Sequence, residues 1–188
     1  MSERTKTSVT GAAAARAARI WNGQSFEIDL WRQLRDDEAL PADGLALVSI
    51  ARWRAERTEL SGREPGTIGV YLVPNDDIDP QNDELQRLAL IALPFPKFTD
   101  GRSYSTARRL RELWGYANEL RATGDILLDQ LPLMVRCGFT SFGIADAATI
   151  RALERSAPTR MSRMYQSPAL HGDLRRRATS PRVLAAVE

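Results

Sequence analysis

Short apolar runs alternate with longer stretches of helical spacing along residues 19–166. Apolar, β-prone runs predict strands, and stretches with apolar residues three or four positions apart predict amphipathic helices. The first segment, 20–31, has Asn22 and Gly23 between two apolar runs, which predicts a short hairpin or edge piece. The predicted strands after it are 46–53, 67–73, 90–95, 119–122 and 140–144. The predicted helices are 54–60, 79–88, 103–114, 125–137 and 145–155. Pro132 lies inside one predicted helix, where its missing N–H predicts a kink.

The order of these elements predicts an α/β fold. Apolar strands separated by helices are typical of a parallel sheet that helices cover on both faces. We expect a mostly parallel open sheet of about five βα units, doubly wound and Rossmann-like or flavodoxin-like, with right-handed crossovers. The alternative is a partial TIM-type barrel, since the chain is too short for a complete one. A single domain is predicted at 19–166, between disordered tails at 1–18 and 167–188.

Composition narrows the classes of function. The one cysteine, Cys137, and the one histidine, His171, exclude an internal disulfide and a cysteine-based zinc cage, and they weaken a Ser-His-Asp or Cys-His site. No metal site is expected. The net charge of +2 comes from the tails, because the body has more acidic than basic residues, so nucleic-acid binding is not expected.

Membrane and export signals are not expected either. The longest apolar stretch, 88–95, is too short to span a bilayer. The first residues do not resemble a secretory signal, which favours the cytoplasm. A homo-oligomer through the N-terminal edge segment is compatible with the sequence.

Candidate chemistry lies in the loops that follow the strands, because the carboxyl ends of parallel strands gather ligands. The loop after 90–95 is the densest polar stretch of the chain. Lys97 is the only lysine of the body in an arginine-rich chain, so a compact ammonium with a shiftable pKa is indicated there. Lys97 with Asp100 or Asp125 forms the candidate acid–base set.

The same loops predict a cradle for an anion at a helix N-terminus. Arg121 would add a guanidinium from the neighbouring strand end. The residues predicted to bind the anion are Thr99, Gly101, Arg102, Ser103, Arg121, Thr123, Gly124 and Gln130. The alternative is a capped helix, with Asp100 or Ser103 as N-cap, Gly101 at a positive φ and Arg102 paired to Asp125. Both interpretations can hold together.

The motifs FPKFTDGRSYSTARRLRE, ELRATGDILLDQL and RCGF, within 95–139, resemble a bacterial family with an uncharacterised domain. VYLVPNDD (70–77) and MYQ (164–166) extend the resemblance. Genes of that family commonly lie beside those of assimilatory sulfite reductase, and its members are often labelled oxidoreductases involved in sulfite reduction. Pro132 and the long tails depart from the family pattern.

The resemblance implies a role in sulfur assimilation, with components of sulfite reductase as partners. The residues themselves support a pocket for a small oxyanion such as sulfite, sulfate or phosphate. No G-x-G-x-x-G follows a predicted strand and no cysteine set exists for an iron–sulfur cluster, so no cofactor is identified. Three functions stay open: an anion-binding accessory protein, a small enzyme using Lys97 with Asp100 or Asp125, and a protein-interaction scaffold.

Overall fold

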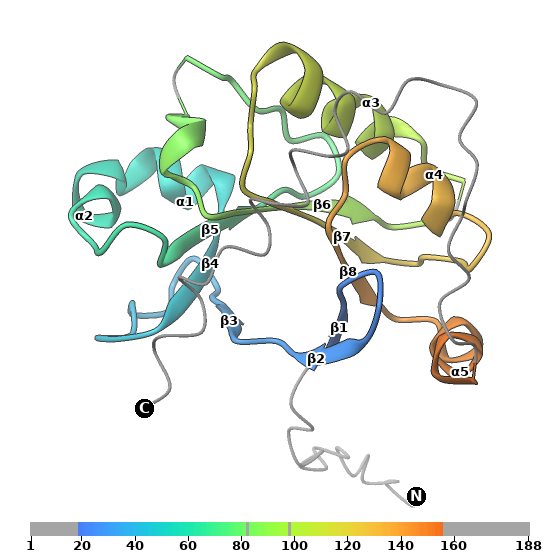
Figure 1. Ribbon diagram of the computed structural model, residues 1–188. Helices are drawn as coiled ribbons and strands as arrows, with labels where there is room; N and C mark the ends of the chain where they lie inside the picture. The colour runs from blue at the N-terminus through green and yellow to red at the C-terminus, as the bar shows by residue number, and fades with distance from the viewer. Residues whose placement is uncertain (1–18, 82, 98, 156–188) are drawn as a thin grey trace, which may run out of the picture.

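The computed structural model describes residues 19–81, 83–97 and 99–155 (Figure 1). The predicted tails at 1–18 and 167–188 lie outside these residues, as does the predicted end of the domain at 166. No helix of the described part is long and apolar enough to cross a membrane.

One eight-stranded sheet runs through the described chain in the order β2-β1-β8-β7-β6-β5-β4-β3. Its six strands from β3 to β8 are parallel and follow chain order, whereas β1 pairs antiparallel with both β2 and β8. The strands are β1 (Arg19–Trp21), β2 (Phe26–Ile28), β3 (Trp31–Gln33), β4 (Leu45–Ser49), β5 (Ile68–Tyr71), β6 (Leu90–Phe95), β7 (Glu119–Gly124) and β8 (Ser141–Ile144).

The sheet curls into a half-barrel, with the helices on its convex side (Figure 1). A doubly wound sheet needs a reversal of strand order, and the order from β3 to β8 has none. Right-handed crossovers between successive neighbours place the helices between β4 and β8 on the same face. The α/β class and the mostly parallel sheet are therefore confirmed. The partial-barrel alternative describes the shape, and the expectation of helices on both faces is wrong.

The helical elements differ in extent from those that the sequence predicts. They are α1 (Ile50–Ala55), α2 (Arg57–Ser61), the 3-10 turn η1 (Leu85–Arg87), α3 (Arg102–Arg108), the π-helical turn η2 (Arg109–Leu113), α4 (Leu131–Arg136) and α5 (Ala147–Arg155). The predicted strand 46–53 ends at Ser49, because the Ser49 hydroxyl accepts the Arg52 N–H at 3.0 Å and caps α1.

The helix predicted at 79–88 is wrong except for η1. The carboxylate of Asp83 is fully buried, accepts the Asp79 N–H at 2.6 Å and pairs with Arg54 at 2.7 Å. Such side-chain bonds to the backbone compete with helical hydrogen bonds. Glu84, at φ +47°, also leaves the helical region.

The predicted kink at Pro132 is wrong as well. The structure begins α4 at Leu131, so Pro132 occupies the first turn rather than the interior of a helix. An N–H in the first turn has no partner within the helix, and proline is well tolerated there.

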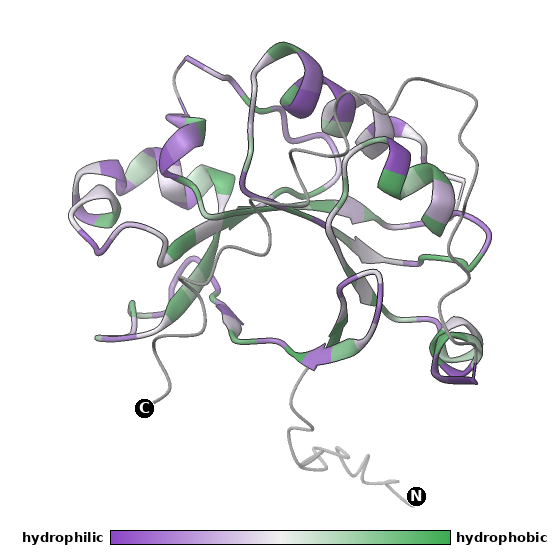
Figure 2. Cartoon of the chain, in the orientation of Figure 1, coloured by the Kyte–Doolittle hydropathy of each residue, from purple (hydrophilic) through white to green (hydrophobic). Residues whose placement is uncertain are grey.

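Each central strand divides its side chains between two faces. Val48, Val70 and Ile91 belong to the main core with the helices, together with Trp53 and Leu110. The alternate side chains form a smaller cluster of Leu47, Leu90 and Ala92 with Trp31 and Tyr71, which lies on the concave face. Figure 2 shows the resulting pattern of largely hydrophobic central strands beside helices of mixed character.

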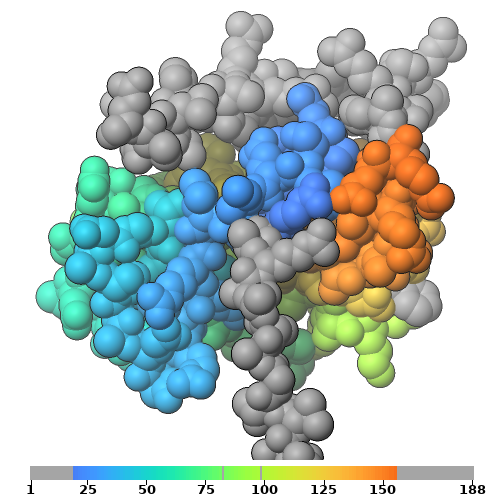
Figure 3. Space-filling view, turned by 90° about the horizontal axis from the view of Figure 1, so that it is seen from below, coloured from blue at the N-terminus to red at the C-terminus, as the bar shows by residue number. Residues whose placement is uncertain are grey.

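The N-terminal segment crosses the open side of the half-barrel. The predicted hairpin is confirmed as β1 and β2, with Gly23 at φ +92° in the turn. Asp29 and Leu30 alone connect β2 to β3, which are opposite edges of the sheet. In Figure 3 this segment (blue) lies between residues near 150 (orange) and those near 50 (cyan to green).

Candidate functional site

A groove of about 390 Å³ opens where β5 and β6 end. Its walls are the start of the β5–β6 connection (72–77), the end of β6 with Pro96, and one face of α3 and η2. The carboxyl ends of parallel strands are the usual place for a ligand, because loops and helix starts converge there. This groove is therefore the candidate site.

Arg102 joins the two walls of the groove. Its guanidinium donates Nε–H and Nη2–H to the Asp100 carboxylate at 3.0 and 2.7 Å, and Nη1–H to the side-chain oxygen of Asn75 at 2.6 Å. Because Arg102 bonds to this carboxylate, the pKa of Asp100 is lowered to about 2 and the pKa of Arg102 is raised. Arg102 therefore pairs with Asp100 rather than with Asp125 as predicted. Its main role is to hold the two walls of the groove together.

Arg109 is the less engaged of the two arginines that line the groove. Its guanidinium lies 3.9 Å from the Asp77 carboxylate, which is 80% exposed, and 5.5 Å from the ring centre of Trp114. Its own side chain is 46% exposed. Ser105 and Thr106 line the groove from the same helix. Arg109 and Ser105 thus present a cation and a hydroxyl to a ligand in the groove, whereas the Thr106 hydroxyl donates to the Arg102 carbonyl at 3.4 Å.

The loop between β6 and α3 holds the other predicted residues of this region. Lys97 and Thr99 are exposed and lie outside the groove lining. Ser103 is buried, and its hydroxyl donates to the Pro94 carbonyl at 2.6 Å. Gly101 is the N-cap residue of α3 at φ −89°, so its expected positive φ is wrong.

Arg121 does not reach the groove, and the predicted contribution of its guanidinium there is wrong. It lies on the concave side of β7, only 2% exposed. Its guanidinium bonds to Asp29 at 2.8 Å, to Glu119 at 2.9 Å and to the Ser141 hydroxyl at 3.3 Å. Two carboxylates thus neutralise the charge of Arg121.

The remaining predicted residues lie at the end of β7. Thr123 donates to the Leu93 carbonyl at 3.4 Å, and Gln130 accepts the Leu127 N–H at 3.1 Å. Gly124 pairs with Phe95 at the same sheet edge, and the Asp125 N–H donates to the Phe95 carbonyl at 2.8 Å. They are near neighbours of the β6–α3 loop in the sheet, but they do not line the groove.

Sequence reasoning missed Arg109, Ser105 and Thr106. The spacing of these residues could have identified them. Ser105 follows Arg102 by three positions, Thr106 follows Arg102 by four and Arg109 follows Ser105 by four, so they share one helix face with Arg102. Within the described residues, no cluster of three or more His, Cys, Asp or Glu side chains could hold a metal ion.

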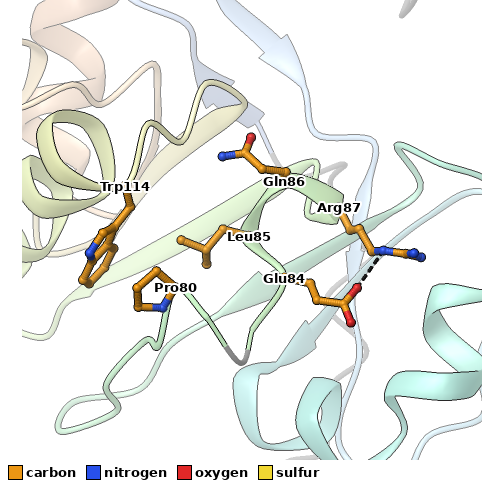
Figure 4. Close-up of a pocket in the computed structure, with 6 residues that line it drawn as sticks. All are labelled: Pro80, Glu84, Leu85, Gln86, Arg87 and Trp114. Carbon is orange, nitrogen blue, oxygen red and sulfur yellow. Dashed lines mark ion pairs between the residues drawn. The ribbon is translucent and has the colours of Figure 1, made fainter.

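A second hollow, of about 350 Å³, lies beside Trp114 (Figure 4). Figure 4 shows Trp114 on one side with Pro80 and Leu85 near it, and Glu84 on the other side in an ion pair with Arg87 at 2.6 Å. This hollow includes η1, which comes just before β6, so it adjoins the amino end of that strand. Arg109, which lines the groove, stacks on the Trp114 ring and connects the two regions.

Comparison with known proteins identifies a family. A family model described as "Bacterial protein of unknown function (DUF934)" matches residues 69–173, which include both walls of the groove. No curated protein and no solved structure matches the chain.

Proposed function

The chain belongs to the bacterial family of unknown function DUF934, and we propose that it is an accessory protein of assimilatory sulfite reduction whose groove binds a small oxyanion. The likeness of residues 95–139 to proteins encoded beside sulfite reductase supports the metabolic part of this proposal. The observation that carries the binding part is Arg109, which lines the groove and, among the described residues, has no closer carboxylate contact than the 3.9 Å to Asp77. Guanidinium groups suit oxyanions because their donors match the spacing of two oxygens.

The groove favours binding over acid–base chemistry. Asp100 has a pKa of about 2 because Arg102 bonds to its carboxylate, so it holds no proton to donate near neutral pH. Lys97 lies in the same loop but outside the groove lining. A Lys97→Ala strain that fails to grow on sulfate, while its protein still folds and binds the anion, would favour the enzyme alternative instead.

Calorimetry tests the binding part. Purified protein is titrated with sulfite, sulfate and phosphate, and we expect saturable binding at about millimolar concentration or below. Arg109→Gln should weaken it about tenfold or more, since one charge-assisted contact is lost. Arg108→Gln is the matched control, because Arg108 is 62% exposed, pairs with Glu112 and does not line the groove. Absence of binding by all three anions contradicts an oxyanion site and leaves docking on sulfite reductase.

Growth of a gene-deletion strain tests the metabolic part. We expect no growth on sulfate or sulfite and normal growth on sulfide, which would place the protein at the reduction of sulfite. The wild-type gene and Arg108→Gln should restore growth, whereas Arg109→Gln should not. Normal growth of the deletion strain on every sulfur source would refute the assignment.

A further inference from the structure

The groove is larger than a free oxyanion requires. A four- or five-atom ion fills on the order of two water volumes of about 30 Å³ each, whereas the groove measures about 390 Å³. A cavity of that size is typical of sites for organic molecules. An inorganic ion bound at Arg109 would leave most of the groove to water.

Part of the groove lining is apolar: Leu72, Val73 and Pro74 come from the wall after β5, and Leu93, Pro94 and Pro96 come from the wall at the end of β6. Leu72 and Leu93 are buried, so the apolar surface open to a ligand comes from Val73 and the prolines. Val73 is a large hydrophobic residue that is 49% exposed, so its side chain presents unburied apolar surface. Covering such surface with an apolar part of a ligand is favourable, because water is released from both.

The charges of the groove also disfavour a bare anion. Three carboxylates, from Asp76, Asp77 and Asp100, line it with the guanidinium groups of Arg102 and Arg109. Arg102 is already bonded to Asp100 and Asn75. With Arg102 paired to Asp100, Arg109 shares the groove with two further carboxylates, Asp76 and Asp77, so its attraction for a small dianion is offset. Tight binding therefore needs a favourable contact in addition to Arg109.

We infer that the groove takes an oxyanion ester, a phosphate or sulfate group on a small apolar body, with the oxyanion at Arg109 and the body against Val73. This inference rests on the proposed oxyanion site and adds the class of its ligand. Contact between the apolar body and Val73 adds binding free energy that the mixed charges of the groove do not provide.

Paired titrations of the full-length protein test it. Phenyl phosphate is compared with phosphate, phenyl sulfate with sulfate, and phenol serves as the ring without the oxyanion. We expect each ester to bind about tenfold more tightly than its inorganic ion, since the ring buries apolar surface. Val73→Ser should remove most of that ratio and leave the affinity for the inorganic ion unchanged. Leu128→Ser is the control, because Leu128 is 43% exposed and lies outside the groove lining.

The outcomes separate this inference from the proposed function. Equal affinity for ester and ion overturns the ester assignment and leaves the oxyanion site intact. An ester preference that Val73→Ser does not change, or binding of phenol as tight as that of phenyl phosphate, also overturns it. If neither ester nor ion binds, both proposals fail. If the esters bind and the inorganic ions do not, the site for a free oxyanion fails and the ester assignment stands. Reduced binding of ester and ion in Arg109→Gln, with the ester preference retained, supports both.

Discussion

The guanidinium of Arg121 donates a hydrogen bond to the carboxylate of Asp29 at 2.8 Å. Arg121 is on β7, and Asp29 belongs to the two-residue link between β2 and β3. These residues are 92 positions apart. Because β2 and β3 are opposite edges of the sheet, the pair ties the segment that crosses the open side to the concave face. Arg121 therefore fixes the curl of the sheet and does not serve the groove.

Arg121→Met is expected to destabilise the protein by about 3–5 kcal/mol, because it leaves two partly buried carboxylates, Asp29 and Glu119, without their counterion. The free energy of unfolding in urea measures this change. Arg32→Met on β3 is the control: Arg32 is 61% exposed and pairs with Glu38, so its loss should cost under about 1 kcal/mol. Equal effects of the two substitutions would contradict the role assigned to Arg121.

The acidic end of the pH profile should depend on Asp100. Its pKa is about 2 in the folded protein, because Arg102 bonds to its carboxylate, against about 4 in an unfolded chain. A depressed pKa stabilises the folded state above pH 4, and this contribution is lost as the pH falls toward 2. Carbon NMR of the carboxyl group should show a midpoint near 2 in the wild type.

Arg102→Gln should move the Asp100 midpoint part of the way back toward 4, since the guanidinium bonds are lost while the backbone N–H of residue 102 still donates to the carboxylate. Arg87→Gln, which breaks a separate ion pair with Glu84, should leave it unchanged. A midpoint near 4 in the wild-type protein would show that the Asp100–Arg102 pair does not form in solution.

The sequence predicts the strands better than their arrangement. Runs such as 90–95 and 140–144 are apolar enough to identify β6 and β8 almost to the residue. The periodicity of apolar residues does not reveal the order of strands in the sheet. That order decides whether helices cover one face of the sheet or both. The sequence predicts a short strand at 119–122, and pairing with β6 extends β7 to Gly124.

For the candidate site too, the sequence predicts local features better than long-range ones. The polar loop after β6 was identified, and Asp100, Arg102 and Ser103 do line a groove. Arg121 was misplaced because its position in a strand does not reveal that its partner, Asp29, lies far away in the chain. Alternation along β7 puts Arg121 on the face opposite to Leu120 and Ala122, but only the curl of the sheet makes that face an interior.

Gly124 has a packing role that a substitution can expose. Its φ is +115°, and a Cβ atom there would lie 2.4 Å from the Phe95 carbonyl oxygen, which is fixed within the β6–β7 pairing. Gly124→Ala should therefore cost at least about 2–4 kcal/mol in unfolding free energy. Gly66→Ala shares the positive φ, at +93°, with nothing within 4 Å, so it should cost only about 1–2 kcal/mol. Similar costs at both positions would show that the close approach to Phe95 is absent.

Tyr116 should contribute to stability through its buried hydroxyl. The ring is 1% exposed, and the hydroxyl lies 3.0 Å from the Leu88 carbonyl and 3.1 Å from that of Glu119. Tyr116→Phe is expected to cost about 1–2 kcal/mol at pH 7, since it removes the one hydroxyl donor that both carbonyls share, although the Leu88 carbonyl keeps the Asn118 amide at 2.9 Å. Tyr104→Phe, which keeps the ring contact with Phe95, should change stability by less than about 0.5 kcal/mol.

The stability of Tyr116→Phe should also depend on alkaline pH differently from that of the wild type. Burial raises the pKa of Tyr116 well above 10, whereas the phenol ionises near 10 in the unfolded chain. The unfolded state alone therefore loses this proton as the pH passes 10, and the wild-type protein loses stability that Tyr116→Phe cannot lose. Urea unfolding at pH 7, 9 and 11 should show the difference between the two proteins narrow at pH 11. A difference that stays constant would mean that the Tyr116 hydroxyl ionises equally in both states and is not buried in solution.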